Sequence, residues 1–303
     1  MIARGEHLAA MRSRGIRLLH GDEVIAGKVK ASDTPSDLGP QDLVIVALKA
    51  NLLPVVAQSA AALLGRETAV VFAQNGIPWW YGHGLSSSRR SPPDLSRLDP
   101  GGLIDQAVAR ERVMGAVIYS ANEVAEPGVI RNHVPGNNML VVGEIDDRQS
   151  ERVKQLRMML EKSGMSSPAA SDIRQVIWAK LIQNLATSTL CVVTGSNIGA
   201  VRGDAGLAQI QQRIAQEGRA IAQAHGIAAE GAPPRPAGGQ SSGLIGHKPS
   251  MLQDYERNRP MEIEAQLMTP LAFGRSAGVA APTLEALIPV AAHKAAAKGL
   301  YKI

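Results

Sequence analysis

The feature that most constrains the fold is a pair of short apolar runs within residues 42–76, separated by a segment with helical spacing. The runs DLVIVALKA (42–50) and ETAVVFAQNG (67–76) are too short for typical helices, whereas LLPVVAQSAAALLG (52–65) has helical spacing and ends at a glycine. This order predicts two buried parallel strands joined by a helix. Parallel sheets bind ligands at the carboxyl ends of their strands, so Lys49, Asn75 and Gly76 become candidate site residues. Taken alone, a solvated loop lysine and a plain turn explain them at least as well.

The chain after this unit is expected to finish the sheet with antiparallel strands. Residues 112–144 predict strand, turn, strand, turn, strand, because Pro127-Gly128 and Pro135-Gly136 interrupt runs rich in strand formers. Between them and the second apolar run lies a predicted loop that contains the aromatic segment PWWYGHG (78–84) and a basic, Ser- and Pro-rich stretch typical of a solvated loop. A helix is expected at about 150–163.

From residue 172 to 229 the pattern is helical throughout. Lys180 and Asn184 stand one turn apart on the same face of an otherwise apolar helix, so they either line a cleft or form a snorkelling lysine beside a surface amide. The stretch GAPPRPAGGQSSG (231–243) predicts a break between helices. Helical patterning resumes at 247–279, where Glu262 and Glu264 follow Pro260.

Composition excludes several classes of protein. A chain of 303 residues that is 45% hydrophobic is long enough for two domains. Its net charge of +5 is spread over 32 basic and 27 acidic residues, and only 3% of residues are aromatic, so a small anionic ligand is expected rather than nucleic acid. No run approaches the roughly 20 apolar residues of a membrane helix, and no secretory signal is found, so no membrane contact and a cytoplasmic location are expected.

Cysteine and histidine usage points to neither disulfides nor metal. The single cysteine, Cys191, fits a reducing compartment and is expected to pack in the core. No Cys pair and no H-E-x-x-H spacing occur, so no metal site is predicted.

Six ordered blocks resemble the ketopantoate reductase (2-dehydropantoate 2-reductase) family: ARG at the start, DLVIVALKA, FAQNGI, WAKLIQN, HKPSMLQD and MEIEA. Together they span essentially the whole chain. The resemblance implies an α/β fold with a Rossmann-type NADP-binding domain at 1–165, an all-helical domain at 166–303 and an active site between them. It further implies NADPH-dependent reduction of a small-molecule 2-oxo acid, ketopantoate to pantoate in pantothenate biosynthesis. The alternatives to this function are reduction of a different 2-oxo acid and a catalytically silent truncated homologue. A homodimer is left open as the state of assembly.

The resemblance also implies roles for individual residues. It makes Lys180 the catalytic acid that protonates the ketone oxygen and Glu262 the acid that orients the substrate hydroxyl. The remaining positions are implied to bind the substrate (Asn75, Asn184, Ser250) or the cofactor (Arg4 at the NADP 2′-phosphate, Lys49, Asn75).

Without the resemblance, ordinary structural explanations would suffice for several of these residues. Glu262 would stabilise a helix N-terminus after Pro260, and Ser250 would cap the following helix. Asp254 and Glu256 would be exposed helix residues.

Two departures from the family pattern are apparent. The family's first strand, G-x-G-x-x-G loop and first helix, roughly 25–30 residues, do not precede Arg4. The preferred explanation is a start codon placed at an internal Met; the alternative is a short protein that has lost cofactor binding. In addition, Ser188 stands where the family often has a second Asn. Ser188 and the PWWYGHG segment motivate the alternative substrate.

Overall fold

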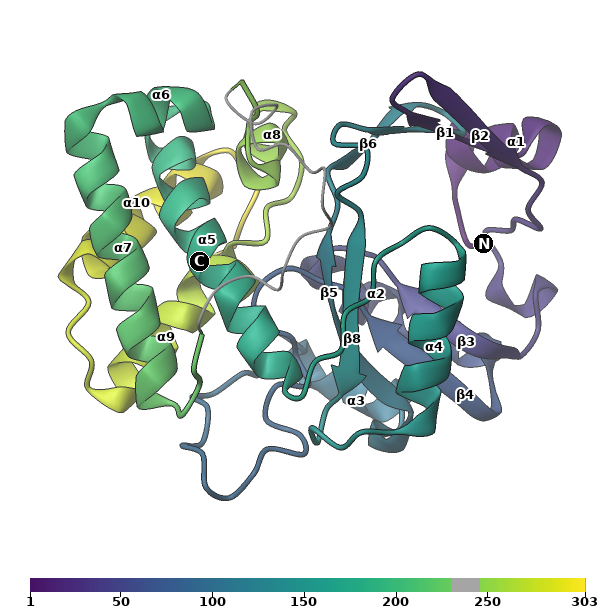
Figure 1. The fold of residues 1–303 in the computed structure, drawn as a ribbon, viewed down its shortest axis with the longest axis horizontal. Helices are drawn as coiled ribbons and strands as arrows, with labels where there is room; N and C mark the ends of the chain where they lie inside the picture. Colours follow the sequence, from purple (N-terminus) through teal and green to yellow (C-terminus); the bar gives the residue numbers. More distant parts are fainter. Residues whose placement is uncertain (230–245, 303) are drawn as a thin grey trace.

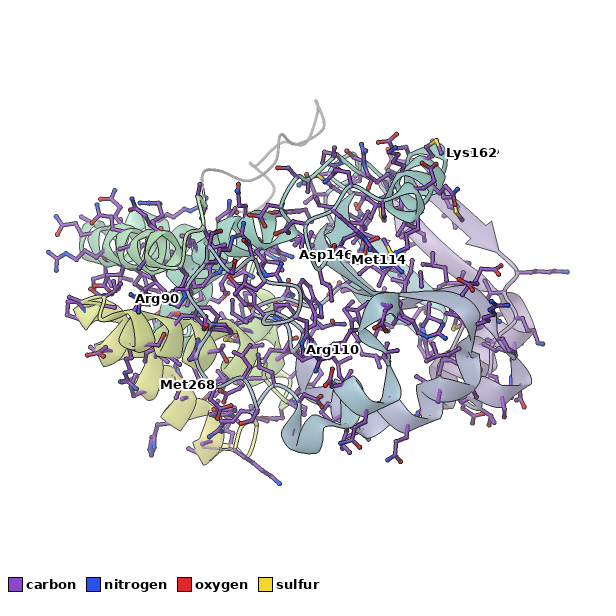
Figure 2. The ribbon with its side chains drawn as sticks, turned by 90° about the horizontal axis from the view of Figure 1, so that it is seen from below. Arg90, Arg110, Met114, Asp146, Lys162 and Met268 are labelled. Atoms are coloured by element: carbon purple, nitrogen blue, oxygen red, sulfur yellow. The ribbon has the colours of Figure 1, made fainter. Side chains whose placement is uncertain are left out.

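The computed structural model describes residues 1–229 and 246–302, so the break predicted at 231–243 lies outside the described residues. The chain forms an α/β half (α1 to α4) and a helical half (α5 to α10) that lie side by side (Figure 1). Figure 2 shows the same two halves from below, with Met268 in the helical half and Lys162 at the outer side of the α/β half. The predicted fold class is confirmed, while the domain boundary at residue 165 stays a prediction.

One four-stranded sheet contains the strands predicted from the apolar runs. Strands β3 (Gln41–Val46), β4 (Leu64–Phe72) and β5 (Val113–Tyr119) are parallel, and β8 (Met139–Glu144) pairs antiparallel with β5. The side chains of β4 alternate between two cores, Val71 towards α4 and Val70 towards α2, α3 and the helical half. The centre of the sheet is therefore buried on both faces, which explains the unbroken apolar run of β4. The predicted burial of the first strand was wrong, because β3 is an edge strand whose residues are all exposed or half-buried.

Helices α2 (Leu53–Ala60), α3 (Leu103–Ala107) and α4 (Glu151–Lys162) complete this layer. Helix α2 is shorter than predicted, because the chain passes through a 3-10 turn and enters β4 already at Leu64. The 3-10 turns of the α/β half are η1 (Pro35–Asp37), η2 (Ala50–Leu52), η3 (Ala61–Leu63), η4 (Pro100–Gly102) and η5 (Arg110–Arg112).

A second four-stranded sheet lies beside helix α1 (Gly5–Arg14) and has the order β2-β1-β7-β6. Its strands are β1 (Ile16–His20), β2 (Glu23–Gly27), β6 (Asn122–Glu126) and β7 (Val129–Asn132). Residues 112–144 thus form four strands in two sheets, where the sequence predicted three. The extra break follows β5, where the side chains of Ser120, Asn122, Asn132 and Asn138 bond to one another.

The helical half consists of α5 (Ile173–Thr194), α6 (Ile198–Gly203), α7 (Ala205–Ala224), α8 (Ser250–Glu256), the π-helical turn η7 (Glu264–Met268), α9 (Thr269–Ala277) and α10 (Pro282–Ala297). Asp172, Asn197 and Asp204 cap the N-termini of α5, α6 and α7 through their side chains. Among the described helices, α5 alone is long and apolar enough to cross a membrane, but 67% of its apolar window is buried in the fold, as in a core helix.

Two glycines let helix α5 and the aromatic segment approach the sheet. A Cβ atom on Gly115 of β5 would lie 2.6 Å from the Trp80 ring, and one on Gly143 of β8 would lie 3.1 Å from Ile173 Cβ. Ile173 is the first residue of α5 and is fully buried. The start of α5 is therefore seated directly on the backbone of β5 and β8.

A buried arginine at the start of α5 binds the aromatic segment PWWYGHG. Arg174 is 0% exposed and donates to the carbonyl oxygens of Tyr81 (2.9 Å), His83 (2.6 Å) and Ile145 (2.7 Å). Trp178 Nε1 donates to Tyr81 Oη at 2.8 Å. The PWWYGHG segment thus serves as a structural bridge between the two halves.

The turn after β4 touches the π-helical turn of the other half. Gly76 has φ +85°, and a Cβ there would lie 2.4 Å from the carbonyl oxygen of Ala265. The next N–H, that of Ile77, donates to the same oxygen at 2.8 Å. Only glycine allows both this backbone conformation and this close approach.

We expect Gly76→Ala to destabilise the protein more than Gly136→Ala. Both glycines have a positive φ (+85° and +79°), but a Cβ on Gly136 meets nothing within 4 Å. The shared backbone strain costs about 1–2 kcal/mol. The clash at Gly76 adds about 1–3 kcal/mol. Urea unfolding of both variants measures the difference, and equal losses of unfolding free energy would contradict the close contact.

Candidate active site

A cavity of about 950 Å³ lies between the two halves. Its walls come from the segments that follow β4 and β5, from one face each of α5 and α7, and from the start of α8. The cavity brings together four residues predicted from the sequence, which are Asn75, Lys180, Asn184 and Ser250. Ser188, the residue that departs from the family pattern, also borders it. Residues far apart in the chain thus meet near the carboxyl ends of β4 and β5. Of the three residues predicted there from the sheet type, Asn75 borders the cavity, whereas Lys49 and Gly76 do not.

Lys180 is held by oxygens of the α/β half. Its ammonium donates to Asn75 Oδ1 at 2.7 Å and to the carbonyl oxygen of Ile118. It also lies 5.2 Å from the centre of the Tyr119 ring. Burial lowers the pKa of Lys180 to about 8, and the negative charge of Glu262 partly opposes this shift. The lysine is therefore protonated at neutral pH yet able to release its proton.

Glu262 is 8% exposed and immediately precedes the helical residues that lead into η7. Its Oε1 accepts from the backbone N–H of Ala50 at 3.0 Å, across the boundary between the halves. Burial raises the pKa of this carboxyl group, whereas the Ala50 N–H and the charges of Lys49 and Lys180 favour the ionised form. The carboxylate accepts from an N–H of the other half. Stabilisation of its own helix end therefore does not explain why Glu262 is buried at this position.

A hydrogen-bonded chain connects Glu262 to Asn184. Gln266 Nε2 donates to Glu262 Oε2 at 3.2 Å, and Asn184 Nδ2 donates to Gln266 Oε1 at 3.3 Å. Gln266 is 2% exposed. The sequence analysis missed Gln266, although a glutamine in a buried helical stretch, four residues after a candidate acid, was a usable signal.

Lys49 lies at the contact between the halves and not in the cavity wall. Its ammonium is 2.7 Å from Asp254 Oδ2 and donates to the carbonyl oxygen of Pro260 at 3.1 Å. Arg259 binds the other carboxylate oxygen of Asp254 at 3.2 Å. The expectation that Asp254 is exposed was wrong, since the residue is 4% exposed and needs these two cations. The cofactor role of Lys49 stays a prediction.

Arg4 and Ser250 occupy helix starts. Arg4 directly precedes α1 and is exposed, next to the parallel bridge between Ile2 and Ser32, and its cofactor role stays a prediction. Ser250 is the first residue of α8, but Pro249 occupies the N-cap position, so a capping role for Ser250 is wrong. Ser250 instead borders the cavity.

The PWWYGHG segment and Ser188 differ in their relation to the cavity. Trp79, Trp80 and Tyr81 are buried in the core and do not line the cavity, so the segment gives no reason for a different substrate. Ser188 is buried and does line it. The substrate question therefore rests on Ser188.

Cations predominate around the cavity. Besides Lys180, the described residues of its wall include the cations Arg202 and Arg219, against the acidic residue Glu123. Burial lowers the pKa of His247, so this histidine adds no positive charge at neutral pH. Glu123 is itself paired with His133 at 3.1 Å and with Arg257 at 3.3 Å. The cavity thus favours an anionic ligand, as expected from the charge of the chain.

Two family models match the chain: Ketopantoate reductase PanE/ApbA over residues 1–83, and Ketopantoate reductase PanE/ApbA C terminal over residues 172–295. The 2-dehydropantoate 2-reductase of Mesorhizobium japonicum is 38% identical over 302 residues, which cover 99% of this chain and 91% of that protein. The enzyme of the same name from Halobacterium salinarum is 22% identical, with 94% and 86% covered.

Solved structures with the same fold include a Ralstonia solanacearum protein provisionally described as a ketopantoate reductase. Its TM-score is 0.83 at 30% identity, with 99% of this chain and 91% of that chain covered. A D-mandelate dehydrogenase solved with NADH and anilino(oxo)acetate has a TM-score of 0.77 at 20% identity, with 99% and 91% covered, a likeness that concerns the fold alone.

We expect the pH profile of 2-oxo acid turnover to fall above about pH 8, because Lys180 then loses the proton that it would donate. Glu262→Gln should move this limb to lower pH, since the charge that raises the pKa of Lys180 is removed. Profiles of kcat/KM for both proteins provide the measurement. A limb near the ordinary lysine pKa of 10.5, or one unmoved by Glu262→Gln, would contradict the assignment.

Proposed function

Since the chain belongs to the ketopantoate reductase family, we propose that it reduces ketopantoate to pantoate with NADPH in the cytoplasm, as a step of pantothenate biosynthesis. The observation that carries this proposal is the position of Lys180. Its ammonium sits in the cavity wall at the carboxyl ends of β4 and β5, bonded to Asn75 and to the carbonyl oxygen of Ile118.

Lys180 supplies the proton of the reaction. A nicotinamide cofactor provides the hydride when bound. As charge develops on the ketone oxygen, the ammonium stabilises it and then transfers a proton to it from Nζ. Asn75 and Ile118 hold the ammonium in place meanwhile, and the lowered pKa of Lys180 reduces the cost of releasing the proton.

The residues present fit the nicotinamide end of such a cofactor. Asn75 follows β4, and residues 118–122 comprise the end of β5 and the turn into β6. Both border the cavity at the carboxyl ends of two parallel strands, where nucleotide-binding sheets present their ligand contacts. Arg4 and Lys49 are the proposed contacts further along the cofactor. A guanidinium such as that of Arg4 suits a 2′-phosphate, because it can form two parallel hydrogen bonds.

Reduction of a different 2-oxo acid is the second candidate, and Ser188 favours it. The hydroxyl of serine reaches less far than an amide and offers fewer hydrogen bonds. Ser188 and Asn184 both border the cavity, so the smaller side chain bears on which acid fits. The surrounding cations suit the carboxylate of either acid.

The direct test is oxidation of NADPH with ketopantoate, with pantoate identified as the product. Lys180→Ala should retain the fold and lower kcat about a hundredfold or more, because proton donation is lost. Circular dichroism checks the fold of the variant. Faster reduction of another 2-oxo acid would favour the second candidate, and near-normal turnover by Lys180→Ala would contradict the proposed acid.

Cofactor preference tests Arg4. NADPH should be preferred over NADH, and Arg4→Ala should reduce the ratio of the two kcat/KM values, because the pairing with the 2′-phosphate is lost. Arg14→Ala is a matched control, since Arg14 is also exposed but lies at the opposite end of α1. An unchanged ratio in Arg4→Ala would remove Arg4 from the cofactor site.

A further inference from the structure

We propose that Gln266 is a positioning residue that turns the carbonyl oxygen of Asn184 towards the cavity, so that the site selects 2-oxo acids carrying a hydroxyl group. The inference rests on the proposed reduction of a 2-oxo acid and adds the chemical group by which the substrate is distinguished.

The side chain of Gln266 is buried and bonded at both ends. It donates to Glu262 Oε2 at 3.2 Å and accepts from Asn184 Nδ2 at 3.3 Å. Glu262 is fixed in turn by the N–H of Ala50 at 3.0 Å. Gln266 also lies in the π-helical turn η7, a rare conformation that often occurs at functional positions.

These bonds have one direction. The backbone N–H of Ala50 can only donate, and together with the charges of Lys49 and Lys180 it favours the ionised form of Glu262 against the effect of burial. An ionised carboxylate can only accept. Gln266 must therefore present its NH₂ group to Glu262, which leaves its oxygen for Asn184. Asn184 must then present its NH₂ group to Gln266. A flip of either amide would place two acceptors or two donors face to face, at the cost of an unpaired buried group.

The remaining polar atom of the Asn184 side chain is its carbonyl oxygen Oδ1, which is an acceptor. Asn184 lines the cavity one helical turn from Lys180. An acceptor at this place binds a hydroxyl donor of the substrate and disfavours a carboxylate. The substrate carboxylate then binds the cations of the cavity wall, and the substrate hydroxyl binds Asn184 Oδ1. Acids without this hydroxyl group therefore bind less well.

The experiment compares ketopantoate with 3,3-dimethyl-2-oxobutanoate, which lacks only the hydroxyl group. The unmodified protein should prefer ketopantoate in kcat/KM by about tenfold or more, because the analogue leaves the amide oxygen unpaired. Gln266→Met keeps the size of the side chain but forms neither bond. It should reduce this preference severalfold through KM for ketopantoate, with KM for NADPH unchanged.

Thr269→Val is the matched control. Thr269 is buried three residues further along the same helical segment, and its replacement should leave the preference intact. The preference is a ratio between two substrates, so a general loss of stability in a variant does not change it.

A binding measurement separates this inference from the proposed function. Titration calorimetry with pantoate and 2-hydroxy-3,3-dimethylbutanoate tests hydroxyl recognition without turnover. Hydroxyl preference that depends on Gln266, without reduction of ketopantoate, supports the inference and contradicts the proposed function. Equal preference in the unmodified protein and in Gln266→Met overturns the inference even if ketopantoate is reduced. If neither acid binds and neither substrate is reduced, both fall.

Discussion

The close approach of helix α5 to the sheet determines where the active site can form. Gly115 and Gly143 remove the side chains that would hold the helix away, and Arg174 fastens its first turn to three carbonyl oxygens. Lys180 follows two turns later, about 10 Å along the axis. The lysine therefore reaches the ends of β4 and β5 because the packing at the start of α5 fixes both the depth and the rotation of the helix.

The same packing explains the electrostatics of the site. Lys180 is half-buried in the cavity wall and keeps two protein oxygens as acceptors. Glu262 is buried and keeps a backbone N–H and a side-chain amide as donors. Burial lowers the pKa of the lysine and raises that of the glutamate, so both shift towards neutrality. Opposite shifts in two neighbouring groups are frequent at sites of proton transfer, although structural ion pairs also produce them.

Sequence periodicity was sufficient where a local pattern determines the structure. The apolar runs predicted β3 and β4, and the resemblance to ketopantoate reductases is confirmed by the family models. Asn75 borders the cavity, while its role in binding stays a prediction. Sequence periodicity failed where residues distant in the chain determine whether a side chain is buried or functional. Asp254 is buried because Lys49, some 200 positions earlier, meets it, and Gln266 matters because Asn184 faces it. The fourth strand in 112–144 likewise depends on which sheet offers a free edge.

The ion pair between Lys49 and Asp254 also constrains how such a chain can evolve. Each half supplies one member, and the loss of Lys49 would leave a buried carboxylate with Arg259 alone. A change of Lys49 to a neutral residue would therefore be offset by a neutral residue at position 254. A chimera that joined this helical half to an α/β half without a cation at position 49 would carry the same unpaired charge, so the ion pair makes the two halves depend on each other for stability.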